Sequence, residues 1–327
     1  MHLTVIFVGE EGLDAGGVTK DFFQTVFRTL LGPESLAGLF FSPNQRALWF
    51  TPEVPRECDS DYYLIGVLLG LAIYNSVTCP HEARFPLALY RWLQGGRLGW
   101  ADLCELYPDT ASGLLTLLTY PDASSVEDVF SLTFEASIVR FGEPTSVALE
   151  AGGAARAVTG ENRGRYAAAL QDFYLRRASL EASREFQRGF SLVMSTPTLH
   201  LFTPSELRLL VEGEHALDFA ALAEAASYEG GFNAKHPTIR ALWKAVGEMA
   251  YEDKRRFLLF VTGSNQSPIG GLGKLAFKVQ RMCPDTEGLP TAATCFNLLL
   301  LPEYSTEEKL KRKLLTAIRE CSGFGLQ

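Results

Sequence analysis

The sequence predicts an α+β protein that contains more than one compact unit. The chain has 327 residues, which is long for a single hydrophobic core and suggests two or three units. Hydrophobic residues make up 47% of it and charged residues 21%, the usual values for a globular protein. Apolar residues at helical spacing alternate along the chain with short β-like runs bounded by glycine and proline.

The composition argues against several classes of function. A net charge of −8 and a pI near 5.3 disfavour nucleic acid or an anionic membrane surface as the main partner. The longest uncharged apolar stretch, residues 62–74, is too short to cross a bilayer, and no secretion signal opens the chain. The cysteines and histidines show no zinc spacing, so we expect no metal site. Because nothing indicates an oxidising compartment, we expect no disulfide either. No cofactor is predicted. A cytoplasmic protein is predicted, with the nucleus as a second location.

The first hundred residues predict three helical segments and several short strands. Residues 3–8 form a β-like run. A helix then opens around Gly17 and carries apolar side chains at helical spacing up to Gly32. Residues 39–41 and 47–50 resemble two short strands around a turn. The apolar run at 62–74 and a second one at 87–93 are interpreted as helices.

The middle of the chain differs in composition from the first hundred residues. Residues 98–172 alternate short amphipathic pieces with Pro, Gly, Ser and Thr, which indicates an inserted subdomain, with a hairpin or loop at 142–160. Residues 170–194 are predicted to be helical. Another helix begins at Thr203-Pro204 and ends at Gly213. Because polar residues follow that glycine, a hinge is predicted over the residues Gly213, Glu214 and His215.

The last part combines helices and strands. Helices are predicted at 238–249 and 252–261, followed by a turn region at 262–273. Strands are predicted at 276–280 and 295–301. Ser305 and Glu308 have the spacing of a capping box for a final helix that Gly323 ends.

Two glycine patterns fail as nucleotide sites. Gly12 and Gly17 have the spacing of a phosphate loop, but Val18 stands where that loop needs lysine. The pattern G-x-G-x-x-A at 271–276 follows a turn instead of a strand, and no βαβ unit surrounds it. These glycines are predicted to serve turns.

Cys295 is the candidate catalytic residue. A lone cysteine is most often a small buried hydrophobe, but this one lies between a Pro/Gly-punctuated loop and an apolar run. A cysteine hydrolase needs a base, and residues 290–300 contain no His, Lys or Arg; a histidine brought near by the fold would keep that alternative open. Thioester exchange fits better, because it needs access and partial ionisation more than a strong base. Backbone N–H groups of residues 294–296 could stabilise the developing charge.

The residues around Cys295, at 289–297, are LPTAATCFN, and LPEY follows at 301–304. They resemble the catalytic segment of HECT-type ubiquitin ligases, nearest the branches of the Angelman-syndrome ligase and the small HERC proteins. Four further segments fit the same family in the same order: GLDAGGVTKDFF at 12–23, LIGVLLGLAIYN at 64–75, FLLFVTGS at 257–264 and GFGL at 323–326.

The resemblance implies a bilobal fold and a set of partners. Residues 1–212 would be a mainly helical N-lobe that lacks the family's usual first helices, and residues 98–172 would dock the ubiquitin-conjugating enzyme. Residues 213–215 would be the hinge, and residues 216–327 the smaller α/β C-lobe that holds the cysteine. Partners would be a ubiquitin-conjugating enzyme, ubiquitin and protein substrates.

The resemblance also implies roles for single residues. Cys295 would accept ubiquitin as a thioester and pass it to a substrate lysine. Thr294 and Phe296 would shape its surroundings, Asn297 would brace the loop, and Phe324 would position the thioester. An acidic group should assist the attacking lysine, and three alternatives are the terminal carboxylate of Gln327, Asp285 and Glu287. The residues at positions that line the family's docking groove, each with a core role as its alternative, are Leu114, Tyr120, Phe130, Leu132 and Tyr166.

One departure concerns the residue before the Thr-Cys pair. Members of the family usually have histidine there, and this chain has Ala293. The alternative function is therefore a non-catalytic module that binds ubiquitin or a conjugating enzyme.

Overall fold

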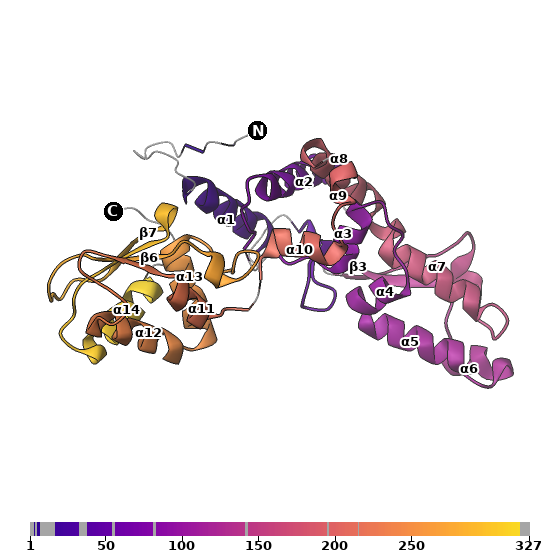
Figure 1. Cartoon of the computed structure of the whole chain (residues 1–327). Helices are drawn as coiled ribbons and strands as arrows, with labels where there is room; N and C mark the ends of the chain where they lie inside the picture. Colours follow the sequence, from indigo (N-terminus) through magenta and orange to yellow (C-terminus); the bar gives the residue numbers. More distant parts are fainter. Residues whose placement is uncertain are drawn as a thin grey trace. The chain divides into compact units, whose positions relative to one another are not determined.

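The computed structural model describes residues 3, 5–6, 17–32, 38–53, 56–80, 83–140, 143–194, 196–214 and 216–320. Helices predominate, and three small sheets accompany them, which confirms the predicted α+β class. The chain divides into two compact units, which consist of residues 1–34, 72–83 and 209–327 and of residues 35–71 and 84–208. Figure 1 shows the whole chain, with colours that follow the residue number. The lobe boundaries stay a prediction.

The helices and strands are as follows. The α-helices are α1 (Gly17–Leu31), α2 (Asp59–Tyr74), α3 (Leu87–Leu93), α4 (Trp100–Leu106), α5 (Pro108–Thr119), α6 (Val126–Phe130), α7 (Arg163–Leu175), α8 (Leu180–Val193), α9 (Thr196–Leu199), α10 (Pro204–Glu212), α11 (Phe219–Ala225), α12 (Pro237–Glu248), α13 (Tyr251–Thr262) and α14 (Glu307–Glu320). The strands are β1 (Phe40–Phe41), β2 (Trp49–Phe50), β3 (Glu135–Arg140), β4 (Glu143–Ala148), β5 (Ser227–Glu229), β6 (Lys278–Arg281), β7 (Thr291–Ala293) and β8 (Leu298–Leu301). The 3₁₀ turns are η1 (Arg56–Cys58), η2 (Ala123–Ser125), η3 (Gly153–Ala155), η4 (Arg177–Ser179), η5 (Leu272–Lys274) and η6 (Thr294–Phe296).

The unit formed by residues 35–71 and 84–208 has an aromatic core. The predicted strand pair is confirmed, with β1 antiparallel to β2. Phe40 and Phe50 lie with ring centroids 5.3 Å apart, and the ring of Phe186 from α8 lies 5.4 Å from Phe50. The Tyr62 hydroxyl donates to the carbonyl of Leu39, so the polar end of this buried side chain is satisfied. These rings fix α2 and α8 to the strand pair.

Two glycines allow α2 and α8 to approach closely. A Cβ on Gly66 of α2 would lie 2.1 Å from the Phe186 carbonyl oxygen, and a Cβ on Gly189 of α8 would lie 1.9 Å from the carbonyl oxygen of Tyr63. Any larger side chain would force the two backbones apart. Gly66 in the 64–75 segment is therefore required for the packing of α2 against α8.

The single helix predicted at 170–194 is wrong. The chain forms α7, breaks at Arg176 and the turn η4, and resumes as α8. The break turns the Ala178 carbonyl toward another segment, where it accepts a hydrogen bond of 2.8 Å from the amide of Glu53. In a continuous helix that carbonyl would accept a hydrogen bond from the amide four residues later. The tertiary contact with Glu53 therefore overrides the local helical pattern.

The inserted segment contains α4 to α7 and one hairpin. Strand β3 pairs antiparallel with β4, from Glu135 opposite Ala148 to Arg140 opposite Glu143. A hairpin or loop was predicted at 142–160. The hairpin exists, but only its second strand, β4, lies in that range, because its first strand, β3, ends at Arg140.

The C-terminal part, orange to yellow in Figure 1, is a four-stranded sheet with helices α11 to α14 packed against it. The strand order is β5-β6-β8-β7, with β5, β6 and β8 parallel and β7 antiparallel at the edge. Buried Leu299 and Leu301 of β8 share one core with Phe257, Leu258 and Leu314 of the helices. The helices predicted at 238–249 and 252–261 and the strand predicted at 276–280 are confirmed as α12, α13 and β6.

The two ends of the chain differ from the sequence expectation in detail. Of the strand predicted at 3–8, the structure describes Leu3, Val5 and Ile6, and none has secondary structure. The predicted Ser305 cap of the last helix is wrong: the Lys309 amide donates to the Thr306 hydroxyl at 3.1 Å, so the cap lies one residue later. Gly323 lies outside the described residues. No helix within the described ranges is long and apolar enough to span a bilayer.

Candidate active site

Cys295 lies in η6, the tight 3₁₀ turn that joins the antiparallel strands β7 and β8. The prediction that the cysteine begins the strand is wrong, because β8 starts only at Leu298. Asn297 is the reason: it adopts the left-handed conformation, with φ of 48° and ψ of 45°, and so reverses the chain between the strands. The turn is held by the sheet, since Ala293 and Leu298 face each other in the ladder.

Two segments that are far apart in the sequence meet beside this turn. Thr294 is buried, and Gly263 ends helix α13 with φ of 75°. A Cβ on Gly263 would lie 3.6 Å from the Thr294 Cβ, so the two backbones are adjacent there. The FLLFVTGS segment therefore supports the LPTAATCFN segment, a contact that the sequence alone did not predict.

The residues after the cysteine have opposite environments. The Phe296 side chain is 63% exposed. Asn297 is half-buried, its carbonyl accepts from the Lys278 amide at 3.0 Å, and its side-chain oxygen is buried with no hydrogen-bond partner in the described part of the chain. An orphaned buried acceptor costs on the order of 1–3 kcal/mol. Asn297 thus braces the turn through its backbone, while Phe296 presents an apolar surface beside Cys295.

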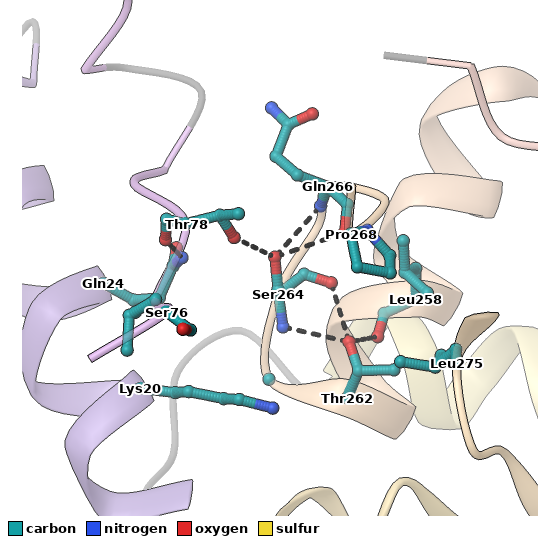
Figure 2. A pocket seen from close by; sticks show the side chains of 12 residues that line it. Lys20, Gln24, Ser76, Thr78, Leu258, Thr262, Ser264, Gln266, Pro268 and Leu275 are labelled. Carbon is teal, nitrogen blue, oxygen red and sulfur yellow. Dashed lines mark hydrogen bonds between the residues drawn. The ribbon is translucent and has the colours of Figure 1, made fainter. Parts of the chain in front are cut away.

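A small pocket with both polar and apolar lining residues lies next to the turn, within the same compact unit. It is lined by Gly263 and by residues of α1, of the segment after α2 and of the loop after α13. Figure 2 shows the Thr78 hydroxyl bonded to the Ser264 hydroxyl at 3.0 Å and the Thr262 hydroxyl oxygen accepting from the Ser264 amide at 3.1 Å. It also shows Lys20 extending from α1 toward this loop.

Asp285 and Glu287, two of the acidic groups considered for lysine activation, are held in ion pairs. Both carboxylates lie 2.9 Å from the Lys309 ammonium, and Glu287 lies 3.1 Å from that of Lys313. Hydrogen bonding by Lys309 lowers the pKa of both carboxyls below their ordinary values. These pairs tie the loop before β7 to α14. Phe324 and Gln327 lie outside the described residues.

The predicted hinge residues follow α10 directly. Gly213 has φ of 70°, and a Cβ there would lie 2.5 Å from the Ser267 carbonyl oxygen, so only glycine fits. The Glu214 amide donates to the Ser267 carbonyl at 2.9 Å. His215 lies outside the described residues. A hinge role for these residues stays a prediction.

The five predicted groove residues divide by exposure. Leu114 and Tyr166 are buried, whereas Tyr120, Phe130 and Leu132 are half-buried. The Tyr120 and Phe130 rings meet edge to face at 5.3 Å. Two exposed apolar residues on the same helices, missed by the sequence reasoning, are Leu115 and Val129. Helical spacing on α5 and α6 would have found them once the helix bounds were known.

The described residues outside the turn offer neither a metal-binding cluster nor an activated thiol. No group of three or more His, Cys, Asp and Glu side chains in the described ranges could hold a metal ion. Cys58, Cys79, Cys104 and Cys283 are free thiols. Burial raises the pKa of the Cys79 thiol, and the same effect raises that of Cys58 less, so neither resembles an activated nucleophile.

Comparison with known proteins establishes the family. Residues 24–327 match the family described as HECT-domain (ubiquitin-transferase). The chain belongs to the HECT-domain family. The predicted resemblance is confirmed, and the turn η6, the edge strand β7 and the contact with the end of α13 are features of this HECT domain.

Several curated relatives are similar over almost the whole chain. The HECT domain is 38% identical over 325 residues to human HERC4, named a probable E3 ubiquitin-protein ligase, with 99% of this chain and 30% of that protein covered. It is 37% identical over 340 residues to the probable ligase HUL4 of Eremothecium gossypii and 36% over 342 residues to the probable ligase HECTD2 of Mus musculus. The chain covers 40% and 43% of these two proteins. It therefore spans less than half of each relative.

Proposed function

We propose that this chain is the catalytic domain of a ubiquitin ligase that carries ubiquitin as a thioester on Cys295. A conjugating enzyme delivers ubiquitin, the Cys295 thiolate attacks the carbonyl of its thioester, and the ubiquitin then passes to a lysine of a protein substrate. The family match over residues 24–327, which includes the segment around Cys295, carries this proposal. The names of the relatives as probable E3 ubiquitin-protein ligases agree with it.

The geometry around Cys295 supports thioester exchange. The backbone of Cys295 lies in a turn that joins two paired strands, so the sheet fixes the two ends of the turn. The turn stands at the edge of the sheet, and exposed Phe296 leaves its surface open to a partner protein. Thr294, Phe296, Asn297 and Phe324 keep their predicted supporting roles. The expected cytoplasmic or nuclear location also stays a prediction.

Charging by a conjugating enzyme tests the proposal. The chain is incubated with activating enzyme, ATP, labelled ubiquitin and a panel of conjugating enzymes, and the products are separated without reductant. Wild type should gain one ubiquitin that a thiol reagent removes, and Cys295→Ala should gain none. A chain that binds the charged conjugating enzyme but forms no adduct would instead be a binding module, the alternative that Ala293 favours. Continuous release of free ubiquitin would indicate a hydrolase.

Docking of the conjugating enzyme is tested with two matched substitutions in the predicted groove. Tyr120→Ala removes a half-buried ring and should weaken binding of the conjugating enzyme about tenfold or more, with little change in the free energy of unfolding. Leu114→Ala removes a buried side chain and should cost about 2–5 kcal/mol of stability. Isothermal titration calorimetry and urea unfolding measure the two effects. Unchanged affinity in Tyr120→Ala would contradict the groove.

A further inference from the structure

Helix α5 ends with a carbonyl that its own segment pairs poorly. In a regular helix the carbonyl of Leu117 would accept a hydrogen bond from the amide of residue 121, but Pro121 has no N–H. The amide of Tyr120 reaches the same carbonyl only at 3.4 Å, which is long for a hydrogen bond. The end of α5 therefore needs a donor from elsewhere in the fold.

Arg163, the first residue of α7, supplies that donor. Nη1 of its half-buried side chain lies 3.1 Å from the Leu117 carbonyl oxygen and 2.7 Å from the Tyr120 carbonyl oxygen, and it donates to both. A cation suits this position, because the C-terminal end of a helix carries partial negative charge. Residues 98–139 contain no lysine or arginine, so the segment that includes α5 provides no cation of its own.

The segment before α7 holds the backbone of Arg163 in place. The side-chain oxygen of Asn162 accepts a hydrogen bond of 2.8 Å from the Thr159 amide. Gly160 approaches the turn between α5 and α6 so closely that a Cβ there would lie 2.3 Å from the Ala123 carbonyl oxygen. Helices α5 and α7, both labelled in Figure 1, also contact each other. Arg163 therefore reaches the end of α5 from a fixed base.

The two hydrogen bonds act on a residue of the predicted docking groove. Tyr120 leaves α5 in an extended conformation, with φ of −61° and ψ of 125°. Its ring meets the Phe130 ring edge to face at 5.3 Å. Because Arg163 holds the Tyr120 carbonyl, it fixes the backbone from which the Tyr120 ring projects.

We propose that Arg163 is a positioning residue for the conjugating enzyme, because it holds the end of α5 so that the Tyr120 ring is presented to that partner. The inference rests on the proposed function, in which residues 98–172 dock the conjugating enzyme. Arg163 acts through Tyr120 and needs no contact with the partner. Cys295 belongs to the other compact unit, so the reaction of a docked complex should not depend on Arg163.

Arg165 provides the matched control. It lies two residues further along α7, its side chain is 61% exposed, and its guanidinium pairs with the Glu150 carboxylate at 2.6 Å. If Arg163 acted only through its positive charge on this surface, Arg165→Gln would weaken docking as much as Arg163→Gln. Arg163→Lys is the conservative variant, because it keeps a cation with N–H donors on a flexible stem.

The test measures single-turnover transfer of ubiquitin to the full chain at increasing concentrations of charged conjugating enzyme. Arg163→Gln should raise the half-saturating concentration at least about fivefold and keep the maximal rate constant within about twofold of wild type. Arg165→Gln should match wild type, and Arg163→Lys should recover most of the loss. In a Tyr120→Ala background, Arg163→Gln should add less than about twofold, because both changes remove the same contact.

Folding is checked separately for every variant by far-UV circular dichroism and urea unfolding. If Arg163→Gln does not fold, Arg163→Met is the second variant, since it keeps an apolar stem of similar length and lacks only the donor. The same shift in half-saturating concentration is expected of it.

Several results would overturn the inference and leave the proposed function intact. They are an unchanged half-saturating concentration in the folded Arg163 variant, an equal shift in Arg165→Gln, no recovery in Arg163→Lys, or a full additional shift in the Tyr120→Ala background. A lower maximal rate constant at an unchanged half-saturating concentration would overturn it too, because Arg163 would then act after docking. Absence of thioester on wild type would reject the proposed function itself, and the inference with it.

Discussion

Phe296 combines two properties at the scale of single residues: it follows Cys295 directly, and most of its side chain is exposed to solvent. An exposed ring contributes little to folding, so its place beside the cysteine needs a reason outside the core. We propose contact with ubiquitin or the conjugating enzyme during transfer as that reason.

Replacing Phe296 by alanine should separate stability from transfer. Phe296→Ala should change the free energy of unfolding by less than about 0.5 kcal/mol and slow thioester formation severalfold. Tyr251→Ala is the matched control, because Tyr251 is also an exposed ring, 54% accessible, at the other end of α13 from Gly263 and about 18 Å away along the helix. Equal charging rates for wild type and Phe296→Ala would contradict a contact role.

At the scale of elements, the packing of α2 against α8 depends on Gly66 and Gly189, which have no side chains. Gly189→Ala would place a Cβ 1.9 Å from the Tyr63 carbonyl oxygen, and backbone cannot yield as a flexible side chain does. We expect a loss of about 1–3 kcal/mol in the free energy of unfolding, measured by urea denaturation. Gly113→Ala on α5 is the control: a Cβ there meets nothing within 4 Å, and stability should rise by about 0.5–1 kcal/mol. Equal stabilities for Gly189→Ala and wild type would contradict the close packing.

The loop before β7 should respond to acid through its ion pairs with α14. Hydrogen bonds from Lys309 lower the folded-state pKa of Asp285 and Glu287 below their ordinary values of 3.8 and 4.5. The pairs therefore stabilise the fold fully above those ordinary values, and this contribution is lost as the pH falls through the lower folded-state pKa values.

Carboxyl ¹³C chemical shifts followed by NMR measure both pKa values directly. Lys309→Met should raise both pKa values toward 3.8 and 4.5, and it should reduce the loss of stability between pH 7 and pH 3. Ordinary values in the wild-type protein would mean that the loop is not held by these pairs in solution.

The sequence predicted those elements whose signal is local. Helices α1, α12 and α13 carry apolar residues at helical spacing, and all three form at or near the predicted positions. Strand β7 was missed because Thr-Ala-Ala has no β signal of its own, and its pairing with β8 creates the strand. The break between α7 and α8 was missed because it depends on a hydrogen bond from distant Glu53.

The candidate site was likewise predicted only where its signal is local. Cys295 could be named from its own segment and from a family resemblance. The contact of Thr294 with Gly263 joins two segments of the C-terminal part, and the pocket lined by Lys20, Thr78 and Ser264 joins segments more than 180 residues apart. No local pattern encodes such a meeting, because it arises only when the core of the unit has assembled.

At the scale of the whole molecule, family membership supports the proposal that Cys295 carries ubiquitin. The HECT-domain match spans residues 24–327, and the chain covers 30–43% of the relatives compared. The central claim concerns what this span can do by itself: accept ubiquitin on one particular cysteine among six.

Intact-mass and peptide-mapping mass spectrometry of the charged chain tests that claim most directly. Wild type incubated with a charged conjugating enzyme should gain the mass of one ubiquitin, released by thiol, with Cys295 as the cysteine that charging protects from alkylation. Cys295→Ser should gain a ubiquitin that thiol does not release, or none. A thiol-labile ubiquitin that persists on Cys295→Ala, or that maps to Cys58, Cys104 or Cys283, would contradict the account.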